Sequence, residues 1–385
     1  MGPVKLLVAA RSVRGLTGTE TTVFEQARRF AALGWEYHVC GERLDAERLR
    51  AAGAAAHRVP RWPWGSRLKR RVFDALASRV AARGGFDLVC GHGDTFRQDV
   101  LSLHNCVHAA HEAVHGTPLP DSSGPGWMHA RILRERGFRL LIANSELMRR
   151  DVVARFGVPA GLVEVVHPGH DPRRFRPGGR AELGAAARRE LGVPAEAPLV
   201  GLITSGDFRK RGVPLFLEAL ARLDAGLRGK LRVLVLGSES RLGPYRRLAG
   251  EAGLGERILF LPPDPRVERF YHALDVYCHP ALYEEFGQSV QEALACGTPV
   301  LASRRVGAAE LLEGTVYGEL LPERPEAVRL SSDLTRLLGD AALRSALRNT
   351  GPVAVKGNTW DSNFAKTRGL FEKVLEEKTK RNVVP

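Results

Sequence analysis

The chain has 385 residues, 44% hydrophobic and 26% charged, a globular composition that excludes a disordered chain and favours two domains. Its net charge of +14 favours an anionic partner such as nucleic acid, an acidic membrane face or a phosphorylated substrate, although an arginine-rich composition alone would also produce it. No apolar run approaches the ~20 residues of a membrane span, and the segment MGPVKLLVAARS does not have a signal-peptide pattern. Five cysteines without a CxxC pair predict reduced, mostly buried thiols in a cytosolic protein.

Apolar runs alternate with helix-periodic segments along the first half of the chain, starting with a buried strand at 4–10. We expect further strands at 37–40, 57–59, 86–91, 100–104, 140–143 and 163–167, and helices at 23–33, 46–52, 68–82, 128–136 and 146–156. This alternation predicts a doubly wound α/β domain over residues 1–172.

The second half repeats the pattern after a Pro-, Gly- and Arg-containing linker at 172–194, which includes an entry helix at 181–191. We expect strands at 199–205, 232–236, 258–261, 275–278, from 300 onward and at 316–321, and helices at 213–223, 245–252, 267–273 and through 354. A break at Gly351–Pro352 precedes a last helix at 363–375. The predicted domains are therefore 1–172, 190–355, and a terminal helix in 356–385 that packs back on the first domain. Two Rossmann-like halves that face each other leave a cleft at their strand C-terminal ends.

Two glutamates flank a Phe-Gly turn in the stretch 279–303. Glu284 precedes the turn and can accept hydrogen bonds from sugar hydroxyls, whereas Glu292 lies on the following helix and can accept from two ribose hydroxyls. The turn offers free backbone N–H groups at a helix N-terminus, which suit a diphosphate. The alternative is two solvated helix-face acids. The residues expected to line this part of the site are Glu284, Phe286, Gly287, Gln288, Ser289 and Glu292.

A basic turn follows the first predicted strand of the second domain, in the sequence SGDFRKRG at 205–212. Lys210 and Arg211, with Gly206 in the same turn, can neutralise a nucleotide diphosphate and stabilise it as a leaving group. Either cation could grip the phosphates, and an ordinary solvated basic turn would look similar.

The glutamate pair and its surroundings closely resemble the E-x7-E signature of the retaining GT4 glycosyltransferases, which have the GT-B fold. Asn144–Ser145, Phe156–Val158, Val165–Asp171 and Phe175 are similar to the segment that closes the family's first domain. The SDF-x-x-x-G form of the basic turn, read here as Ser205–Gly212, resembles the lipopolysaccharide-core glucosyltransferase branch. The resemblance implies hexose transfer from a nucleotide sugar, with retention of configuration and without a catalytic metal.

Two further candidates lie in the first domain. Gly18 and Thr19 follow the first strand, where glycine allows close approach to a phosphate, although a plain β–α turn is equally consistent. His104 ends a strand, and the resemblance implies that it contacts the reacting sugar. The His-rich loop beyond it, through His111, Glu112 and His115, could serve a metal, or a loop or acceptor contact.

Five cations and two tryptophans occur without an acid in Arg61–Arg71. Basic and interfacial aromatic residues together suit an anionic membrane surface. A nucleic-acid patch, or a solvated helix face with buried tryptophans, would look similar.

The function expected from the resemblance is transfer of glucose from UDP-glucose to a lipopolysaccharide-core or other lipid-linked glycan. The protein would be cytoplasmic and peripheral at the inner membrane face, with no cofactor and no nucleic acid. In a front-face mechanism the departing phosphate takes the acceptor proton while Lys210 and Arg211 bear the charge. The alternatives are a GDP-mannose-dependent mannosyltransferase or another GT4 enzyme, and, more remotely, a basic nucleic-acid-binding α/β protein.

Overall fold

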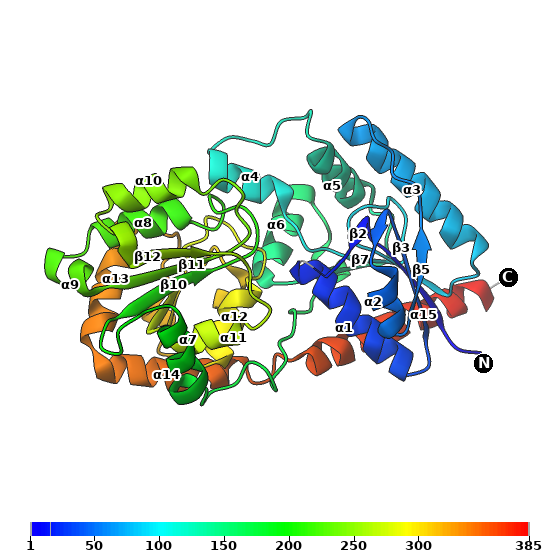
Figure 1. Ribbon diagram of the computed structural model, residues 1–385. Helices are drawn as coiled ribbons and strands as arrows, with labels where there is room; N and C mark the ends of the chain where they lie inside the picture. Colours follow the sequence, from blue (N-terminus) through cyan, green and yellow to red (C-terminus); the bar gives the residue numbers. More distant parts are fainter. Residues whose placement is uncertain (1, 16, 384–385) are drawn as a thin grey trace. The chain divides into compact units, whose positions relative to one another are not determined.

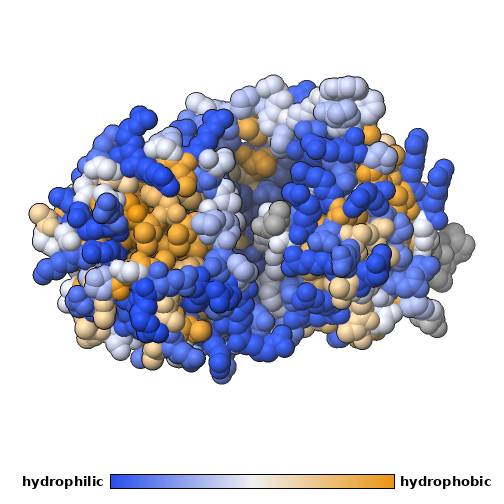
Figure 2. Space-filling model, in the orientation of Figure 1, coloured by the Kyte–Doolittle hydropathy of each residue, from blue (hydrophilic) through white to orange (hydrophobic). Residues whose placement is uncertain are grey.

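The computed structural model describes residues 2–15 and 17–383, which form two compact units (Figure 1). The first unit comprises Met1–Pro168 together with Trp360–Pro385, and the second comprises Gly169–Thr359. The boundary therefore lies at 168, a few residues before the predicted one, and the C-terminal helix belongs with the first unit. Polar residues cover most of the visible face, and apolar residues gather on it over the second unit (Figure 2).

The first unit is built on a seven-stranded parallel sheet in the order β5-β3-β1-β6-β7-β8-β9. The strands are β1 (Lys5–Ala9), β3 (Glu36–Gly41), β5 (Ala54–Arg58), β6 (Leu88–Gly91), β7 (Val100–Ser102), β8 (Leu140–Ala143) and β9 (Val163–Val165), and β2 (Ser12–Val13) pairs separately with β4 (Arg43–Leu44). Because the strand order reverses at β1, the loops after β1 and β6 flank the switch point, where α/β proteins bind their ligands.

Alternate residues of β1 serve the two faces of this sheet. Leu6 and Val8 belong to the core that includes α1 (Gly18–Ala32) and α15 (Trp360–Val383), whereas Leu7 and Ala9 belong to the core that includes α3 (Ser66–Arg83). Phe30 of α1 stacks on Phe371 of α15 at 5.6 Å between ring centroids, so the two helices lie side by side (Figure 1). The remaining helices of this unit are α2 (Ala46–Ala51), α4 (Val107–His115), α5 (Gly124–Glu135), α6 (Glu146–Phe156) and the 3₁₀ turn Ala160–Leu162.

The second unit has a five-stranded parallel sheet in the order β12-β11-β10-β13-β14. Its strands are β10 (Leu199–Ile203), β11 (Arg232–Leu236), β12 (Ile258–Leu261), β13 (Val276–Cys278) and β14 (Val300–Leu301). Its helices are α7 (Ala185–Glu190), α8 (Val213–Ala221), α9 (Ala225–Lys230), α10 (Gly243–Glu251), α11 (Glu268–Ala273), α12 (Gln288–Ala295), α13 (Ala327–Gly339) and α14 (Ala341–Val355). The order reverses at β10, so the loops after β10 and β13 flank the switch point.

Two parallel, Rossmann-like sheets confirm the predicted α/β fold class. Three local predictions were wrong. The His-rich loop is the helix α4, in which the tilted rings of His111 and His115 lie 4.3 Å apart. The strand expected at 316–321 is a 3₁₀ turn at Gly318–Leu320.

The third error concerns the break at Gly351–Pro352, which the structure places inside α14. Gly351 packs closely on α12, where an added Cβ would lie 3.0 Å from the carbonyl oxygen of Leu294. Helix α14 therefore continues across Pro352, although proline lacks the N–H group needed for a helix hydrogen bond.

Candidate functional site

The loops after β10 and β13, residues 204–212 and 279–287, meet at the switch point of the second unit and are called the switch-point loops below. An added Cβ at Gly212 would lie 1.9 Å from the carbonyl oxygen of Pro280, and Gly212 has φ +75°, so glycine permits this approach. The N–H of Leu282 donates to the carbonyl oxygen of Lys210 at 3.0 Å. The two loops are therefore joined through their backbones.

Asp207 shapes the basic turn. Its side chain accepts hydrogen bonds from the backbone N–H groups of Arg209 at 2.8 Å and Lys210 at 3.2 Å. Gly206 has φ +94°, and its N–H donates to the Ser238 hydroxyl at 3.2 Å. This turn sets the direction in which Lys210 and Arg211 project.

Two cations and two carboxylates meet where the switch-point loops join, and we call Lys210, Arg211, Glu284 and Glu285 the charge quartet. The Lys210 Nζ atom donates to both carboxylate oxygens of Glu285, at 2.9 and 3.1 Å. Arg211 forms an ion pair with Glu284. Burial lowers the pKa of Arg211, while the charge of Glu285 opposes that shift. Burial alone would raise the pKa of Glu285, but Lys210 holds it below its ordinary value, so Glu285 is anionic at neutral pH.

A buried histidine lies close to Glu284. His279 is fully buried, and its Nε2 atom lies 3.6 Å from the Glu284 carboxylate. Its Nδ1 atom lies 2.9 Å from the hydroxyl of Tyr277, which also contacts the Ser289 hydroxyl at 2.8 Å. Burial, aided by Arg211, lowers the pKa of His279 to about 3, so the ring is neutral and adds no charge to the quartet.

Glu292 has a separate partner that the sequence did not indicate. The hydroxyl of Tyr271 on α11 donates to the Glu292 carboxylate at 2.9 Å. Burial raises the pKa of Glu292 to about 7, although the Tyr271 hydrogen bond opposes this shift. Glu292 therefore changes protonation near neutral pH.

Four other residues of this turn were predicted to line the site. One packs in the core, and the other three lie at the N-terminus of α12. Phe286 packs its ring in the core of the second unit, and its carbonyl oxygen accepts from the Ala308 N–H at 2.6 Å. Gly287, with φ +94°, begins α12, and no side chain caps that helix end. Gln288 and Ser289 form the first turn of α12 and are half-buried. An anion can approach the uncapped N-terminus through its backbone N–H groups.

The sequence placed Gly18 and Thr19 in a loop of the first unit. The structure instead places both residues in the first turn of α1. Thr17 and Glu20 form a capping box: the Thr17 hydroxyl accepts from the Glu20 N–H at 3.3 Å, and the Glu20 carboxylate accepts from the Thr17 N–H at 3.2 Å. The side chains thus satisfy two of the backbone donors at this helix end.

His104 lies beyond β7, where its Nε2 atom is 3.2 Å from the Ser102 hydroxyl. Its ring stacks at 4.8 Å on His92, a residue that follows β6 and that sequence reasoning missed. Burial, with a smaller contribution from His104, lowers the pKa of His92 well below its ordinary value. The structure therefore stacks these two imidazole rings at the ends of neighbouring strands of the first unit.

The basic segment 61–71 is only partly a free surface. Trp64 is 71% exposed, and Trp62 is also exposed, so neither tryptophan is buried. Arg70, by contrast, is half-buried and binds Asp94 at 3.2 Å. Because its charge is paired inside the unit, Arg70 is not one of the free cations of this segment.

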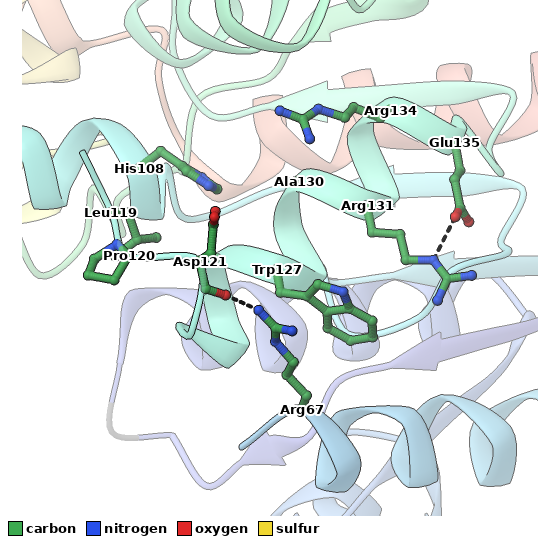
Figure 3. Close-up of a pocket in the computed structure, with 11 residues that line it drawn as sticks. Arg67, His108, Leu119, Pro120, Asp121, Trp127, Ala130, Arg131, Arg134 and Glu135 are labelled. Carbon is green, nitrogen blue, oxygen red and sulfur yellow. Dashed lines mark hydrogen bonds and ion pairs between the residues drawn. The ribbon is translucent and has the colours of Figure 1, made fainter. Parts of the chain in front are cut away.

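A cavity of about 630 Å³ lies among α3, α4 and α5 of the first unit (Figure 3). Trp127 lies between Arg67 and Arg131, whose guanidinium carbons are 5.8 and 5.7 Å from its ring centroid (Figure 3). Arg134 extends from the same helix as Arg131, and His108 and Asp121 project toward each other (Figure 3). The lining residues are Arg67, His108, Leu119, Pro120, Asp121, Gly126, Trp127, Ala130, Arg131, Arg134 and Glu135. We call this space the arginine cavity.

Internal contacts hold some of these charges. Arg67 donates to the carbonyl oxygen of Asp121, and the Arg131 Nε atom donates to Glu135 at 2.6 Å. The cavity retains three guanidinium groups against the carboxylates of Asp121 and Glu135. Its lining can therefore offer positive charge, an aromatic face and a carboxylate acceptor at the same time.

Among the described residues, no cluster of three or more His, Cys, Asp or Glu side chains is arranged to hold a metal ion. None of the helices in residues 2–15 and 17–383 has both the length and the apolar character to cross a membrane. All five cysteines are buried free thiols.

Two family models match the chain, one in each half. Residues 16–174 match "Glycosyltransferase Family 4", and residues 187–353 match "Glycosyl transferases group 1". In fold, the chain is similar to WaaG, a glycosyltransferase involved in lipopolysaccharide biosynthesis, with a TM-score of 0.82 at 19% identity over 95% of this chain and 99% of that one. It is also similar to Anabaena Alr3699/HepE in complex with UDP and glucose, with a TM-score of 0.77 at 19% identity over 96% and 100% of the two chains.

Curated relatives in the sequence comparison are D-inositol 3-phosphate glycosyltransferases. One from Nocardia farcinica is 35% identical over 69% of this chain and 60% of that protein, and one from Catenulispora acidiphila is 28% identical over 93% and 91%. The chain thus spans less than two thirds of the Nocardia relative's length. With the two parallel sheets and both family models, these findings show that the chain belongs to the GT4 family of GT-B glycosyltransferases.

Proposed function

We propose that the protein transfers a hexose from a nucleotide sugar to an acceptor hydroxyl with retention of configuration, with UDP-glucose as the first donor to test. The observation that carries the proposal is the charge quartet at the switch point of the second unit. Lys210 and Arg211 supply two cations in a half-buried site, where charge–charge attraction is stronger than in water. A nucleotide diphosphate matches their charge, and the uncapped N-terminus of α12 adds backbone donors.

Glu284 and Glu292 would bind different parts of the donor. Glu284 leaves Arg211 to accept hydrogen bonds from the sugar hydroxyls, while the neutral ring of His279, 3.6 Å from the carboxylate, adds no competing charge. Glu292 accepts from the ribose hydroxyls while Tyr271 orients it.

The proposed chemistry needs no nucleophile from the protein. The bond between the anomeric carbon and the diphosphate oxygen breaks, the acceptor oxygen bonds to that carbon from the same face, and the acceptor proton passes to the departing phosphate. Lys210 and Arg211 stabilise the negative charge that develops on this phosphate. His104 donates to or accepts from the sugar, and no cofactor takes part.

For the acceptor, we propose a polyhydroxylated ring that carries an anionic group, bound in the arginine cavity. Arg67 and Arg134 suit the anion, Trp127 suits the C–H face of a ring, and Asp121 can accept from hydroxyl groups. Both an inositol phosphate, as in the names of the curated relatives, and an anionic lipopolysaccharide-core glycan meet this description. For a lipid-linked acceptor, the exposed Trp62 and Trp64 with the neighbouring cations would bind the anionic membrane face, and no nucleic acid is involved.

The test is a donor panel of UDP-glucose, UDP-galactose, UDP-GlcNAc and GDP-mannose, incubated with the protein while release of the nucleoside diphosphate is measured. We expect release from one donor, UDP-glucose first, and its loss in Glu292→Ala. Release from GDP-mannose alone would favour the mannosyltransferase alternative. No release from any donor, together with tight RNA or DNA binding, would overturn the proposal.

A further inference from the structure

Glu285 lies beside the proposed sugar-binding Glu284 and holds the cation that the proposed donor needs. It accepts two hydrogen bonds from the Lys210 Nζ atom, and its side chain is only 6% exposed. Its backbone neighbourhood is fixed, because the Glu284 N–H donates to Arg305 at 2.9 Å and the Glu284 carbonyl accepts from Gly307 at 3.0 Å. Glu285 can therefore leave Lys210 through its side-chain torsions while the loop stays in place.

The charge quartet is balanced before any ligand arrives, because its two cations face two carboxylates. The field of Glu285 also reaches Arg211, whose protonated form it favours. A diphosphate adds at least two negative charges to the same half-buried space. Two carboxylates and a diphosphate around two cations would leave uncompensated buried charge, which is strongly unfavourable. Diphosphate binding must therefore displace at least one carboxylate from its cation.

Resting on the proposed function, we propose that Glu285 is a built-in counter-anion: it competes with the donor diphosphate for Lys210, is displaced when the diphosphate binds, and returns to Lys210 as the nucleoside diphosphate leaves. In this arrangement the sugar becomes the partner of Glu284, and Glu285 yields Lys210 to the diphosphate. The competition weakens binding of donor and product alike. After transfer the product still carries the diphosphate, so the return of Glu285 favours its release.

If Glu285 only positioned Lys210, its removal would change the diphosphate affinity in the opposite direction. A carboxylate that only positioned Lys210 would stay bound to it in the complex, and its removal would weaken diphosphate binding. A competitor strengthens diphosphate binding when it is removed. The sign of the change in affinity therefore separates the two roles.

The experiment is isothermal titration of wild type and Glu285→Gln with UDP, GDP, ADP and inorganic pyrophosphate. Glutamine keeps the length of the side chain and a carbonyl acceptor for Lys210, so it removes the charge without emptying the site. We expect the variant to bind its preferred diphosphate at least about tenfold more tightly. Glu218→Gln is the matched control, because Glu218 pairs with Arg222 on the surface of α8 and its loss should leave the affinity unchanged.

Lys210→Met provides the second arm. If Glu285 acts through Lys210, Glu285→Gln in the Lys210→Met background should change the affinity by less than about threefold. Thermal unfolding shows that each variant is folded. If Glu285→Gln does not fold, Glu285→Asp replaces it, because the shorter side chain weakens the pair and should also tighten diphosphate binding.

The outcomes distinguish a failure of the inference about Glu285 from a failure of the proposed function. Unchanged or weaker diphosphate binding by Glu285→Gln, with measurable binding by wild type, overturns the inference and leaves the proposed function standing. Binding of no diphosphate by either protein overturns both. Binding by the variant alone supports the inference, because the internal carboxylate then excludes the ligand from wild type.

Discussion

The charge quartet of the second unit and the arginine cavity of the first are held in place in different ways. Backbone contacts fix the quartet, since Gly212 meets the Pro280 carbonyl and Leu282 bonds to Lys210. Its four charges are paired with one another. The arginine cavity is assembled from side chains of three helices and the loop between α4 and α5, and it retains an excess of cations. The first arrangement suits one fixed group, a diphosphate, and the second can accept anionic rings of different shape.

The largest effect should come from breaking the quartet. Arg211→Ala leaves the buried carboxylate of Glu284 without its cation, so we expect a loss of about 3 kcal/mol in the free energy of unfolding. It also removes charge stabilisation of the leaving group, so donor hydrolysis should fall about 100- to 1,000-fold. Urea unfolding and nucleotide-release assays measure the two effects. Arg209→Ala, an exposed cation two residues away, is the control, and an equal loss there would contradict the assignment.

A backbone substitution tests whether the junction of the switch-point loops matters. Gly212→Ala combines a left-handed backbone with a clash against the Pro280 carbonyl, whereas Gly206→Ala has the left-handed backbone and open space. We expect Gly206→Ala to cost about 1 kcal/mol of stability and Gly212→Ala clearly more, with loss of diphosphate binding in the latter only. Thermal unfolding and titration with UDP provide the comparison. Equal behaviour of the two variants would show that the close approach is unimportant.

The arginine cavity should affect the acceptor alone. Arg67→Ala removes a guanidinium from the rim of the cavity, so we expect the KM for an anionic acceptor to rise about tenfold or more, with the rate of donor hydrolysis unchanged. D-inositol 3-phosphate and a deacylated lipopolysaccharide core are the acceptor probes. Arg79→Ala removes an exposed charge from the same helix and should change neither value. A parallel fall in hydrolysis and transfer for Arg67→Ala would contradict the division between the units.

Glu292 makes donor binding depend on pH. Because burial raises its pKa to about 7, the carboxylate becomes protonated below that value and loses an acceptor for the ribose hydroxyls. We expect the donor KM to rise about tenfold between pH 8 and pH 6. Tyr271→Phe removes a hydrogen bond that lowers this pKa, so the same rise should begin at higher pH. A profile that does not move in Tyr271→Phe would contradict the assignment.

Protonation of Glu292 also affects the free energy of unfolding, in a direction that follows from its pKa. Its pKa in the folded protein lies above the ordinary value of 4.5, so the folded state keeps the proton at a pH where the unfolded chain releases it. The free energy of unfolding should therefore fall as the pH rises from about 4.5 to about 7. Glu292→Gln should remove this contribution from a urea-unfolding series across that range.

The smallest effect concerns the membrane. Arg71 is an exposed cation near Trp62 and Trp64, whereas Arg70 is bound to Asp94 and unavailable. Arg71→Ser should weaken sedimentation with anionic vesicles about fivefold at low salt, and Arg83→Ser at the other end of α3 should not. Unchanged sedimentation of Arg71→Ser would remove the proposal of a membrane contact through this segment.

The sequence placed the switch-point loops of the second unit more accurately than the corresponding groups of the first, for physical reasons. The glutamate pair and the basic turn are local patterns, each within about ten residues, and strand periodicity placed them after β10 and β13. The pairing of Lys210 with Glu285 is not local. It depends on the close approach at Gly212, which joins loops 75 residues apart in the chain.

The arginine cavity could not be predicted from the sequence, because Arg67 and Trp127 lie on separate helices. Helix α4 was missed for a related reason. Cys106 stands at its N-cap and its side chain does not cap the helix, so the usual start signal is absent. The contacts of Tyr271 and His92 could not be predicted from the sequence either, because each residue meets its partner only in the folded arrangement of neighbouring elements.

The ratio of transfer to donor hydrolysis tests the central claim most directly, because it separates the two regions in one measurement. With UDP-glucose or the preferred donor and an anionic acceptor, Lys210→Met should lose both hydrolysis and transfer, and the ratio should change little. Arg67→Ala should keep hydrolysis and lose transfer at low acceptor concentration, so the ratio should fall about tenfold. A fall in the ratio for Lys210→Met, with Arg67→Ala unchanged, would contradict the assignment of the donor to the second unit and of the acceptor to the first.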